Sequence, residues 1–464
     1  MIRRKDSFVK LHALIFLAVL VASPCFAQQG QTGPSPADAA KDIVQKIAAG
    51  EFDAVEAQYT PQMSAALPPG RLATFWAGVL TQEGSFNSVQ SATTGKAQNL
   101  DVVVLVCKFD KNLIDIQIAL DAEGKLAGIH FGAHREPLPP WTPPPYAKQD
   151  SFSEQQILLV NGKFEMPGVL TTPKGNGPFP CVVLVQGSGP QDGDETVGAD
   201  KPFADLAVGL ASHDVAVYRY IKRTFKYHEQ SSDPPDKLTV DDETISDARA
   251  AVALAAKQSK IDPHRVYLLG HSLGAYLAPR IATGDSQIAG IAMMAANVEP
   301  MEKLLLEQMN YLLSSGPPPT ADEQKQLAAV QEAVKKIESP DLKPTDTVSL
   351  LSGPMPAGYW LDLRDYHPIE AAEALKIPIL ILQGGRDFQV PPATNFEEFK
   401  KALSSRKNVT LKFYPALNHL FIAGTGPSTP QEYGKLGHVD EQVIIDIASW
   451  ASVGGEVPHL GASH

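Results

Sequence analysis

The spacing of apolar residues divides the chain into two parts with different expected folds. Apolar residues recur at helical spacing over residues 37–50 and 71–81, and strand-like runs follow them. These runs cover residues 86–92, 102–109, 113–120 and 126–131, with a turn signal at 121–124. Helices followed by consecutive antiparallel strands predict a small α+β domain over residues 37–133.

Strands and helices alternate from residue 151 to the C-terminus, residue 464. An Asn161-Gly162 pair between two strand-like runs predicts a leading hairpin. The alternation predicts a doubly wound, mostly parallel sheet. The expected strands cover residues 156–160, 164–170, 180–185, 215–220, 266–269, 288–293, 377–382 and 410–414. The expected helices cover residues 203–212, 241–258, 273–283, 394–403 and 439–450.

One interval interrupts this alternation. Two helical patterns, at residues 301–313 and 321–337, stand where the next strand of the sheet would be expected. They predict an inserted helical cap over about residues 297–365, lying over the carboxyl edge of the sheet. We expect the aromatic pair Tyr359-Trp360 to line an apolar pocket for an acyl or alcohol group.

Prolines are concentrated between the two parts. The chain holds 38 prolines among its 464 residues, above the usual share of about 5%. Six of them lie within residues 134–150, and consecutive prolines favour an extended polyproline conformation. This segment is therefore predicted to be a semi-rigid linker between the domains.

The N-terminus has the pattern of a secretory signal peptide. Basic residues from Arg3 to Lys10 precede an apolar run at residues 14–22, and a small-residue cleavage site ends at Ala27. The run is too short to span a bilayer well, which disfavours the alternative of a retained anchor. We expect residues 1–27 to be removed and the protein to be exported to the periplasm or the cell exterior, with no membrane anchor after cleavage.

Charge and cysteine content narrow the range of partners. Removing the leader takes away four basic residues and one acidic residue, which lowers the formal charge from −12 to −15. A chain with this negative charge should repel nucleic acid and anionic membrane surfaces, and neither is therefore an expected partner.

The two cysteines of the mature chain are expected to have a structural role. Cys107 and Cys181 lie in apolar runs and are predicted to be buried free thiols. We expect no cofactor and no metal.

The motif Gly270-x-Ser272-x-Gly274 carries the main chemical signal. It follows an apolar strand directly and precedes a helix directly. Such a turn holds a serine in a strained conformation with its hydroxyl exposed, and its glycines leave room for the turn and the helix. The context predicts a nucleophilic serine at position 272.

A serine nucleophile needs a base and an orienting acid, which should follow it in the order acid, then base. Asp387 comes after the strand at 377–382, and His419 comes after the strand at 410–414. His438 remains an alternative base and Asp365 an alternative acid. We interpret His271 as structural. The side chains of successive residues point in different directions, so His271 cannot easily reach the hydroxyl of Ser272.

Two backbone amides are expected to stabilise the oxyanion. One belongs to Leu273, the residue after the nucleophile, and the other to the loop after the strand at 180–185. That loop is rich in glycine, and Ser188 is the predicted second donor, with Gly187 as the alternative.

Several motifs together resemble one enzyme family. Residues 269–282 (LGHSLGAYLAPRIA), 186–190 (QGSGP) and 385–387 (GRD) resemble bacterial α/β-hydrolases of the carboxylesterase and serine aminopeptidase type, often labelled dienelactone-hydrolase-like. The resemblance covers about residues 151–452 and implies an α/β-hydrolase fold with Ser272 as nucleophile, Asp387 as acid and His419 as base. True dienelactone hydrolases use a cysteine nucleophile, so Ser272 argues against that activity. Related enzymes often have a short run with Asp before Lys-Arg and Gly after it. Residues 219–224 (RYIKRT) keep the Lys-Arg pair but lack that Asp and that Gly.

The front domain carries a second resemblance. Residues 37–131 are similar to a domain of unknown function found ahead of such hydrolases, with an NTF2-like cone of helices on a curved sheet. The likeness is carried by residues 52–55 (FDAV), 67–70 (LPPG) and 72–76 (LATFW). It implies no catalytic residues.

These observations lead to three hypotheses about function. The first is a serine esterase that cleaves small-molecule esters through an acyl-enzyme. The second is a peptidase acting on short peptides, in which Glu299, Glu302 or Glu307 of the cap would hold a free amine. The third is a non-catalytic envelope-binding protein whose front domain does the work.

Overall fold

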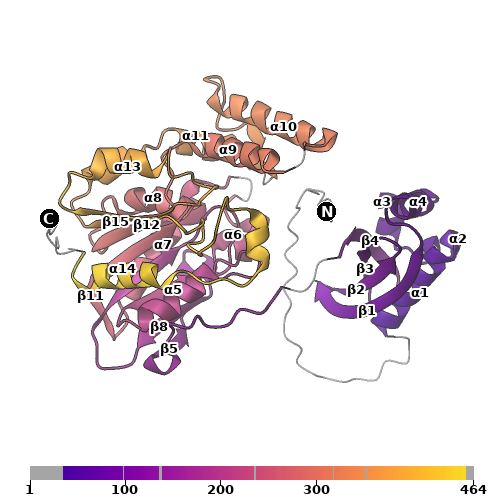
Figure 1. The fold of residues 1–464 in the computed structure, drawn as a ribbon, viewed down its shortest axis with the longest axis horizontal. Helices are drawn as coiled ribbons and strands as arrows, with labels where there is room; N and C mark the ends of the chain where they lie inside the picture. The colour runs from indigo at the N-terminus through magenta and orange to yellow at the C-terminus, as the bar shows by residue number, and fades with distance from the viewer. Residues whose placement is uncertain are drawn as a thin grey trace, which may run out of the picture. The chain divides into compact units, whose positions relative to one another are not determined.

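The computed structural model describes residues 35–97, 99–134, 138–234, 237–316, 318–350 and 353–455 (Figure 1). The predicted signal peptide, residues 1–27, lies outside the described residues. The chain divides into two compact units, with the boundary between residues 137 and 138. Each unit is described by itself below.

The front unit begins with helices and continues with a meander of strands. Its sheet has the order β1-β2-β3-β4, and each neighbouring pair is antiparallel. The helices are α1 (Pro36–Ala48), α2 (Phe52–Glu56), α3 (Pro61–Ala66) and α4 (Arg71–Glu83). The strands are β1 (Phe86–Ala97), β2 (Leu100–Phe109), β3 (Leu113–Leu120) and β4 (Leu126–Ala133). The predicted order of helices and strands is confirmed.

Alternation of side chains along the strands builds the core of the front unit. Ile116 and Ile118 on β3 are fully buried, because residues two apart share one face of a strand. They pack in one cluster with Ile43 and Ile47 of α1. Cys107 on β2 is buried in the same cluster as a free thiol, as predicted.

The second unit is built on an eight-stranded sheet of order β16-β15-β12-β11-β9-β10-β8-β5. The six strands from β16 to β10 run parallel, while β8 is antiparallel to both of its neighbours. This is the predicted doubly wound, mostly parallel sheet of an α/β-hydrolase. The strands are β5 (Phe152–Gln156), β8 (Gly168–Pro173), β9 (Phe179–Val185), β10 (Ala216–Tyr220), β11 (Ile261–His271), β12 (Gly290–Met294), β15 (Ile379–Gly384) and β16 (Val409–Tyr414).

The leading hairpin forms at Asn161-Gly162, but it is not part of the main sheet. Strands β6 (Leu159–Asn161) and β7 (Phe164–Met166) pair only with each other. The run at 164–170, predicted as one strand, is split because Pro167 separates β7 from β8 and has no N–H for a ladder hydrogen bond.

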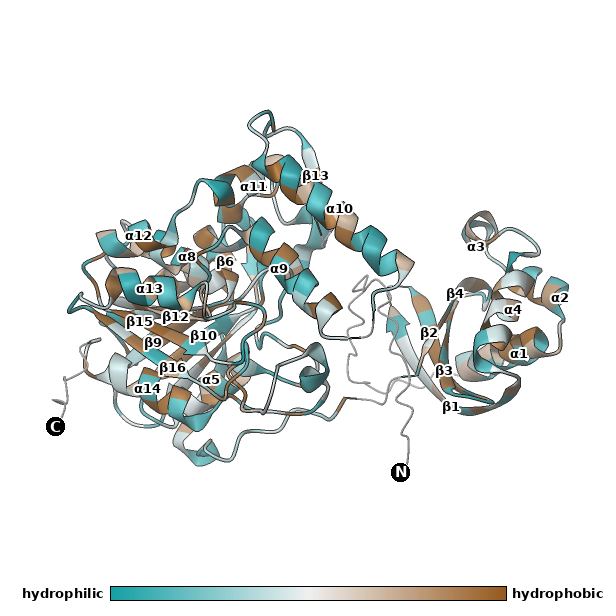
Figure 2. Ribbon diagram, turned by 45° about the horizontal axis from the view of Figure 1, so that its top comes forward, coloured by the Kyte–Doolittle hydropathy of each residue, from teal (hydrophilic) through white to brown (hydrophobic). Residues whose placement is uncertain are grey.

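Both faces of the sheet are covered by helices, so its strands are apolar on both sides. On β9, Val182 and Leu184 pack with α5 (Pro202–Ala211) and α14 (Glu441–Ser452). Val183 and Val185 pack on the opposite face with α7 (Ser246–Ala255), α8 (Leu273–Ala282) and α13 (Phe396–Leu403). Figure 2 shows this as hydrophobic strands between helices whose outer sides are hydrophilic.

The expected cap follows β12 in the chain. It comprises α9 (Met301–Ser314), α10 (Ala321–Glu338), the hairpin β13 (Thr347–Leu350) and β14 (Gly353–Pro356), and α11 (Ala357–Arg364). Helix α12 (Pro368–Ala374) then leads back to the sheet. A capping box fixes the start of α10, because Thr320 and Glu323 bond each other's backbone N–H groups. The sequence pattern did not predict the hairpin.

The proline-rich segment belongs to the hydrolase unit from Leu138 onwards. Trp141 donates from its indole nitrogen to Asp205 at 2.9 Å, and the Tyr146 hydroxyl donates to the Val439 carbonyl at 2.7 Å. These contacts connect residues 138–150, expected to act as a spacer, to the start of α5 and the residues before α14. Among the described residues, no helix has the length and apolar character needed to cross a bilayer.

The anchoring of this segment can be tested at Tyr146, whose ring packs against the α5–α14 side of the core. We expect Tyr146→Ala to lower the free energy of unfolding of the hydrolase unit by about 1–3 kcal/mol, because burial and a hydrogen bond are lost. Leu138→Ala is the control in the same segment, since Leu138 is 51% exposed. Chemical denaturation of the full chain measures both, and equal stability of the two variants would contradict the anchoring.

Candidate active site

Ser272 occupies the turn between β11 and α8 in a strained backbone conformation. Its φ is 53° and its ψ −117°, a region that residues with a side chain rarely adopt. The turn is held by hydrogen bonds from Ser272 N to the Met294 carbonyl at 3.0 Å and from Tyr276 N to the Ser272 carbonyl at 2.9 Å. The hydroxyl makes no hydrogen bond with a described residue and is available for chemistry.

The two motif glycines are required by close backbone approach. A Cβ on Gly270 would lie 2.1 Å from the Gly274 carbonyl oxygen. A Cβ on Gly274 would lie 2.3 Å from the Val185 carbonyl oxygen at the end of β9. Any side chain at either position would therefore push the helix away from the sheet.

Asp387 and His419 meet in the structure, although 32 residues separate them. His419 Nδ1 lies 2.8 Å from Asp387 Oδ2, and each residue is only 4% exposed. The carboxylate is held by the backbone N–H groups of Gln389 and Val390, each at 2.9 Å, and by the Gln383 side chain at 3.0 Å. This arrangement fixes the imidazole and leaves its Nε2 as the nitrogen that can serve a nucleophile.

His419 also lies beside the serine turn. The ring of His271, the residue before Ser272, is 4.6 Å from the His419 ring between centroids. His271 Nε2 lies 2.9 Å from the His419 carbonyl oxygen, so the two loops are joined directly. Ser272, Asp387 and His419 thus gather at the carboxyl ends of β11, β15 and β16.

The alternative base and acid lie in other surroundings. His438 Nδ1 is 3.1 Å from Asp205, whose hydrogen bond raises the pKa of His438. Asp365 is exposed on the cap, 3.6 Å from Arg364. Neither residue contacts the Asp387–His419 pair in the described part of the chain.

The loop after β9 reaches the serine turn and leaves one amide free. A Cβ on Gly187 would lie 3.2 Å from the Ser272 Cβ. Gly187 N donates to Glu195 Oε1 at 2.6 Å, and Gly189 N donates to Glu243 Oε1 at 3.1 Å. Within the described residues, the N–H of Ser188 makes no hydrogen bond, so of the two predicted donors Ser188 is the one available. Leu273 begins α8, where backbone N–H groups have no helical partner.

A second buried histidine–carboxylate pair was not predicted. His271 Nδ1 lies 3.0 Å from Glu195 Oε2, and both side chains are buried. Burial lowers the pKa of His271, but the Glu195 carboxylate, the His419 carbonyl and the charge of Asp387 together raise it above 6.5. The interpretation of His271 as structural agrees with these contacts; no local pattern marked Glu195 as its partner.

The cap contributes three carboxylates in different settings. Glu302 is buried, and Glu299 and Glu307 are half-buried. Burial and the neighbouring Glu299 raise the pKa of Glu307. In the part of the chain that the structure describes, no three His, Cys, Asp or Glu side chains are grouped as a metal site needs.

The raised pKa of His271 predicts a pH-dependent stability. Its charged form stabilises the fold fully below about pH 6.5, and this contribution is lost as pH rises through the folded-state pKa. Glu195→Gln removes the charge facing His271 while keeping an acceptor for Gly187. We expect its loss in free energy of unfolding to be larger at pH 6 than at pH 9. Chemical denaturation at several pH values measures this.

Glu154→Gln is the matched control for this experiment. Glu154 pairs with Arg219 at 3.0 Å, and arginine stays charged throughout this pH range. The loss for Glu154→Gln should therefore stay constant between pH 6 and pH 9. A loss for Glu195→Gln that is equally constant would show that His271 does not titrate as inferred.

Several comparisons relate the chain to known proteins. The family model "Protein of unknown function (DUF3887)" matches residues 40–129, and the model "Serine aminopeptidase, S33" matches residues 201–424. Solved structures with similarity include Est1E from Butyrivibrio proteoclasticus, at 14% identity over 64% of this chain and 99% of that chain with a TM-score of 0.42. A Mycobacterium tuberculosis puromycin-hydrolyzing peptidase is 16% identical over 80% of this chain and 49% of that chain, with a TM-score of 0.43.

The similarity to one curated protein is much higher. Esterase EstD of Thermotoga maritima is 38% identical over 408 residues, which cover 88% of this chain and 93% of EstD. Similarity of this extent includes most of both domains. The chain therefore belongs to the EstD family of α/β-hydrolases and is a hydrolase.

Proposed function

We propose that this protein hydrolyses small-molecule carboxylic esters through Ser272, His419 and Asp387. The observation that carries the proposal is the buried Asp387–His419 hydrogen bond of 2.8 Å beside the strained turn of Ser272. A histidine held in this way has the right tautomer to accept the serine proton through Nε2. Membership in an esterase family supports an ester as the substrate.

The proposed reaction proceeds in two halves. Ser272 Oγ attacks the ester carbonyl carbon while His419 Nε2 takes the hydroxyl proton, giving a tetrahedral oxyanion. The N–H groups of Leu273 and Ser188 bind that oxygen. When the carbonyl re-forms, the alcohol leaves with the proton from His419, and the acyl group remains on Ser272. Water, deprotonated by His419, then releases the acid by the same steps.

The buried setting suits this chemistry. Three donors hold the Asp387 carboxylate in place, facing the imidazole that becomes positively charged during the reaction. The backbone donors of the oxyanion hole are already oriented, so little reorganisation is needed in the transition state. For scale, removing one side-chain donor from the oxyanion hole of a serine protease costs about 2.7–4 kcal/mol of transition-state stabilisation.

Ser272→Ala should abolish turnover of short-chain p-nitrophenyl esters while leaving the thermal unfolding of the protein unchanged. We expect a fall in kcat of at least about 10⁴-fold, since the nucleophile is removed. Ser188→Ala is the matched control, because it keeps the backbone N–H that we assign to the oxyanion. Ester turnover by Ser272→Ala within tenfold of wild type, or a wild-type chain that a fluorophosphonate probe does not label, would refute the mechanism.

The same assay separates ester from peptide substrates. An aminoacyl-anilide, tested beside the acyl ester, reports on the peptidase alternative, for which Glu299 and Glu307 supply neighbouring carboxylates in the cap. We expect the ester to be cleaved with the higher kcat/KM, because the chain belongs to a family that includes an esterase. A preference for the anilide that is lost in Glu307→Gln would favour the peptidase.

We further propose that the protein is exported after cleavage near Ala27. The basic and apolar pattern of residues 3–27 supports this. Cell fractionation followed by intact-mass measurement should find a mature chain that begins near Gln28 outside the cytoplasm. A chain that retains its leader in the cytoplasmic fraction would exclude export.

A further inference from the structure

The loop after β9 is fixed by buried charges from two distant parts of the chain. We propose that Lys222 and Glu243 are positioning residues that orient the Ser188 peptide for oxyanion binding and couple it to the cap through Tyr359. This inference rests on the proposed function, because it gives the loop a role only if the Ser188 N–H binds the oxyanion.

Lys222 controls the direction of the peptide between Gly187 and Ser188. Its Nζ donates to the Gly187 carbonyl oxygen at 2.7 Å, and the side chain is 3% exposed. The carbonyl of Gly187 and the N–H of Ser188 belong to one planar trans peptide, so they point in opposite directions. Holding the carbonyl on the lysine side therefore turns the N–H to the other side of the loop. A charged donor on the carbonyl also polarises the amide and strengthens its N–H as a donor.

Glu243 holds the other flank of the same loop. Its Oε1 accepts from Lys222 Nζ at 2.6 Å and from Gly189 N at 3.1 Å. Glu195 takes the Gly187 N–H on the near side. The amides on both sides of Ser188 are thus bound to buried carboxylates, and only the Ser188 N–H stays free among the three.

Stability alone does not account for this ion pair. Lys222 and Glu243 are both nearly fully buried, and desolvation of two charges offsets much of their attraction. Glu243 lies in the π-helical turn Asp241–Ile245 that precedes α7, and such turns often occur at functional sites. What the pair supplies is a fixed geometry for the loop.

Tyr359 connects this geometry to the cap. Its hydroxyl donates to Glu243 Oε2 at 2.5 Å from helix α11. Burial and the Glu243 charge raise the pKa of Tyr359 well above 10, so it remains a donor at neutral pH. A displacement of α11 by substrate would therefore act on the same carboxylate that holds the loop. Tyr359 and Trp360, the aromatic pair expected to line a pocket, are both buried in the core cluster.

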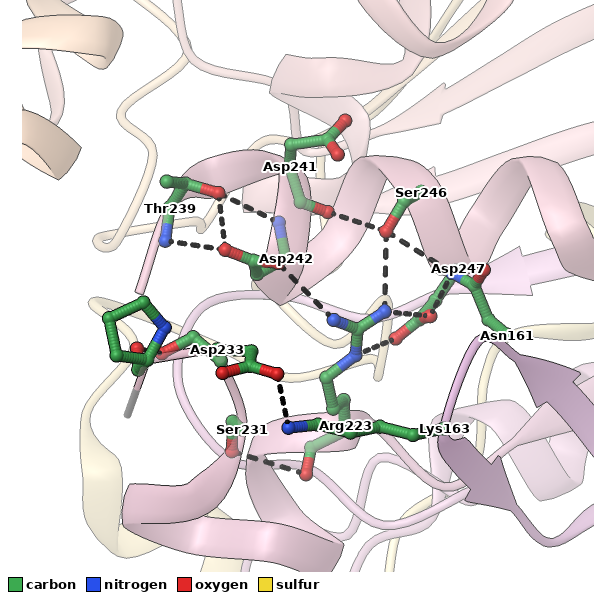
Figure 3. Close-up of polar contacts among 12 residues, drawn as sticks. Asn161, Lys163, Arg223, Ser231, Asp233, Thr239, Asp241, Asp242, Ser246 and Asp247 are labelled. Atoms are coloured by element: carbon green, nitrogen blue, oxygen red, sulfur yellow. Dashed lines mark hydrogen bonds and ion pairs between the residues drawn. The ribbon is translucent and has the colours of Figure 1, made fainter. Parts of the chain in front are cut away.

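The neighbouring ion pair of Arg223 provides a matched control. Arg223 contacts Asp247 through Nε at 2.9 Å and through a terminal nitrogen at 2.5 Å, and Asp242 at 3.4 Å (Figure 3). Its guanidinium also lies over the Phe164 ring, 4.2 Å from the centroid. Arg223 begins α6 (Arg223–Tyr227) directly after Lys222, and Asp247 lies in α7 four residues after Glu243, so this pair is a close neighbour of the first and is similarly buried. Within the described residues it makes no hydrogen bond or ion pair with the 187–189 loop.

The experiment compares Lys222→Met with Arg223→Met in the full-length chain. Steady-state hydrolysis of a short-chain p-nitrophenyl ester gives kcat and KM, and a trifluoromethyl ketone, which forms a tetrahedral oxyanion on the serine, gives an inhibition constant. For Lys222→Met we expect kcat to fall about 10- to 100-fold, KM to change by less than about threefold, and ketone affinity to fall in parallel with kcat. Arg223→Met should keep kcat and ketone affinity within about threefold.

Glu243→Gln and Tyr359→Phe keep the test decisive if Lys222→Met does not fold. Glu243→Gln keeps the shape of the side chain and one acceptor oxygen, but it loses the charge and replaces the other oxygen by a donor amide, so kcat and ketone affinity should fall together by about tenfold. Tyr359→Phe should give a smaller parallel loss, since only the link to the cap is removed. Lys222→Arg should recover part of the kcat, because a charged donor to Gly187 is restored.

Two results would overturn the inference. One is kcat and ketone affinity within twofold of wild type in folded Lys222→Met or Glu243→Gln. The other is an equal loss in Arg223→Met, which would indicate a general effect of buried charge. Failure of the proposed function is distinguishable: wild type itself would then be inactive on esters or would not be labelled at Ser272.

Discussion

The backbone conformation at Ser272 is the constraint on which the rest of the site depends. A residue with a side chain is held at φ 53° because β11 must turn sharply into α8. The turn fits only where the helix can approach the end of β9, and Gly274 allows that approach to the Val185 carbonyl. The same proximity brings the loop after β9, with Gly187, against the serine. The position of Ser272 and that of the loop with the proposed oxyanion donor therefore derive from a single packing arrangement.

Buried charges then set the orientation of groups around this turn. Glu195 binds both His271 and the Gly187 amide, and Glu243 binds both Lys222 and the Gly189 amide. Burying such charges is unfavourable unless each has partners, and these carboxylates are matched with amides and a cation. The amides that flank Ser188 in this loop therefore already have their hydrogen-bond partners before a substrate binds. Such preorganisation allows a transition state to be stabilised electrostatically without rearrangement of the protein.

Much of the fold and of the candidate site could be predicted because the relevant signals are local. Strand and helix periodicity gave the order of elements, and Ser272 sits in a motif read over five residues. Asp387 and His419 were predictable as acid and base because each follows one of two successive strands of the sheet. Errors arose where tertiary context decides. Pro167 splits one expected strand, and the buried pair of His271 with Glu195 has no counterpart in the sequence pattern.

The sequence by itself determined the two domains, the alternating pattern of the sheet and the order serine, acid, histidine, since each depends on spacing along the chain. The tertiary structure decided which polar residues meet. Lys222 and Glu243 are 21 residues apart, and the Tyr359 hydroxyl reaches Glu243 across 116. Contacts between charged residues so far apart in the chain leave no periodic pattern in the sequence, because they depend on how the helices pack on the sheet. Only the folded chain shows that these residues surround one peptide of the loop.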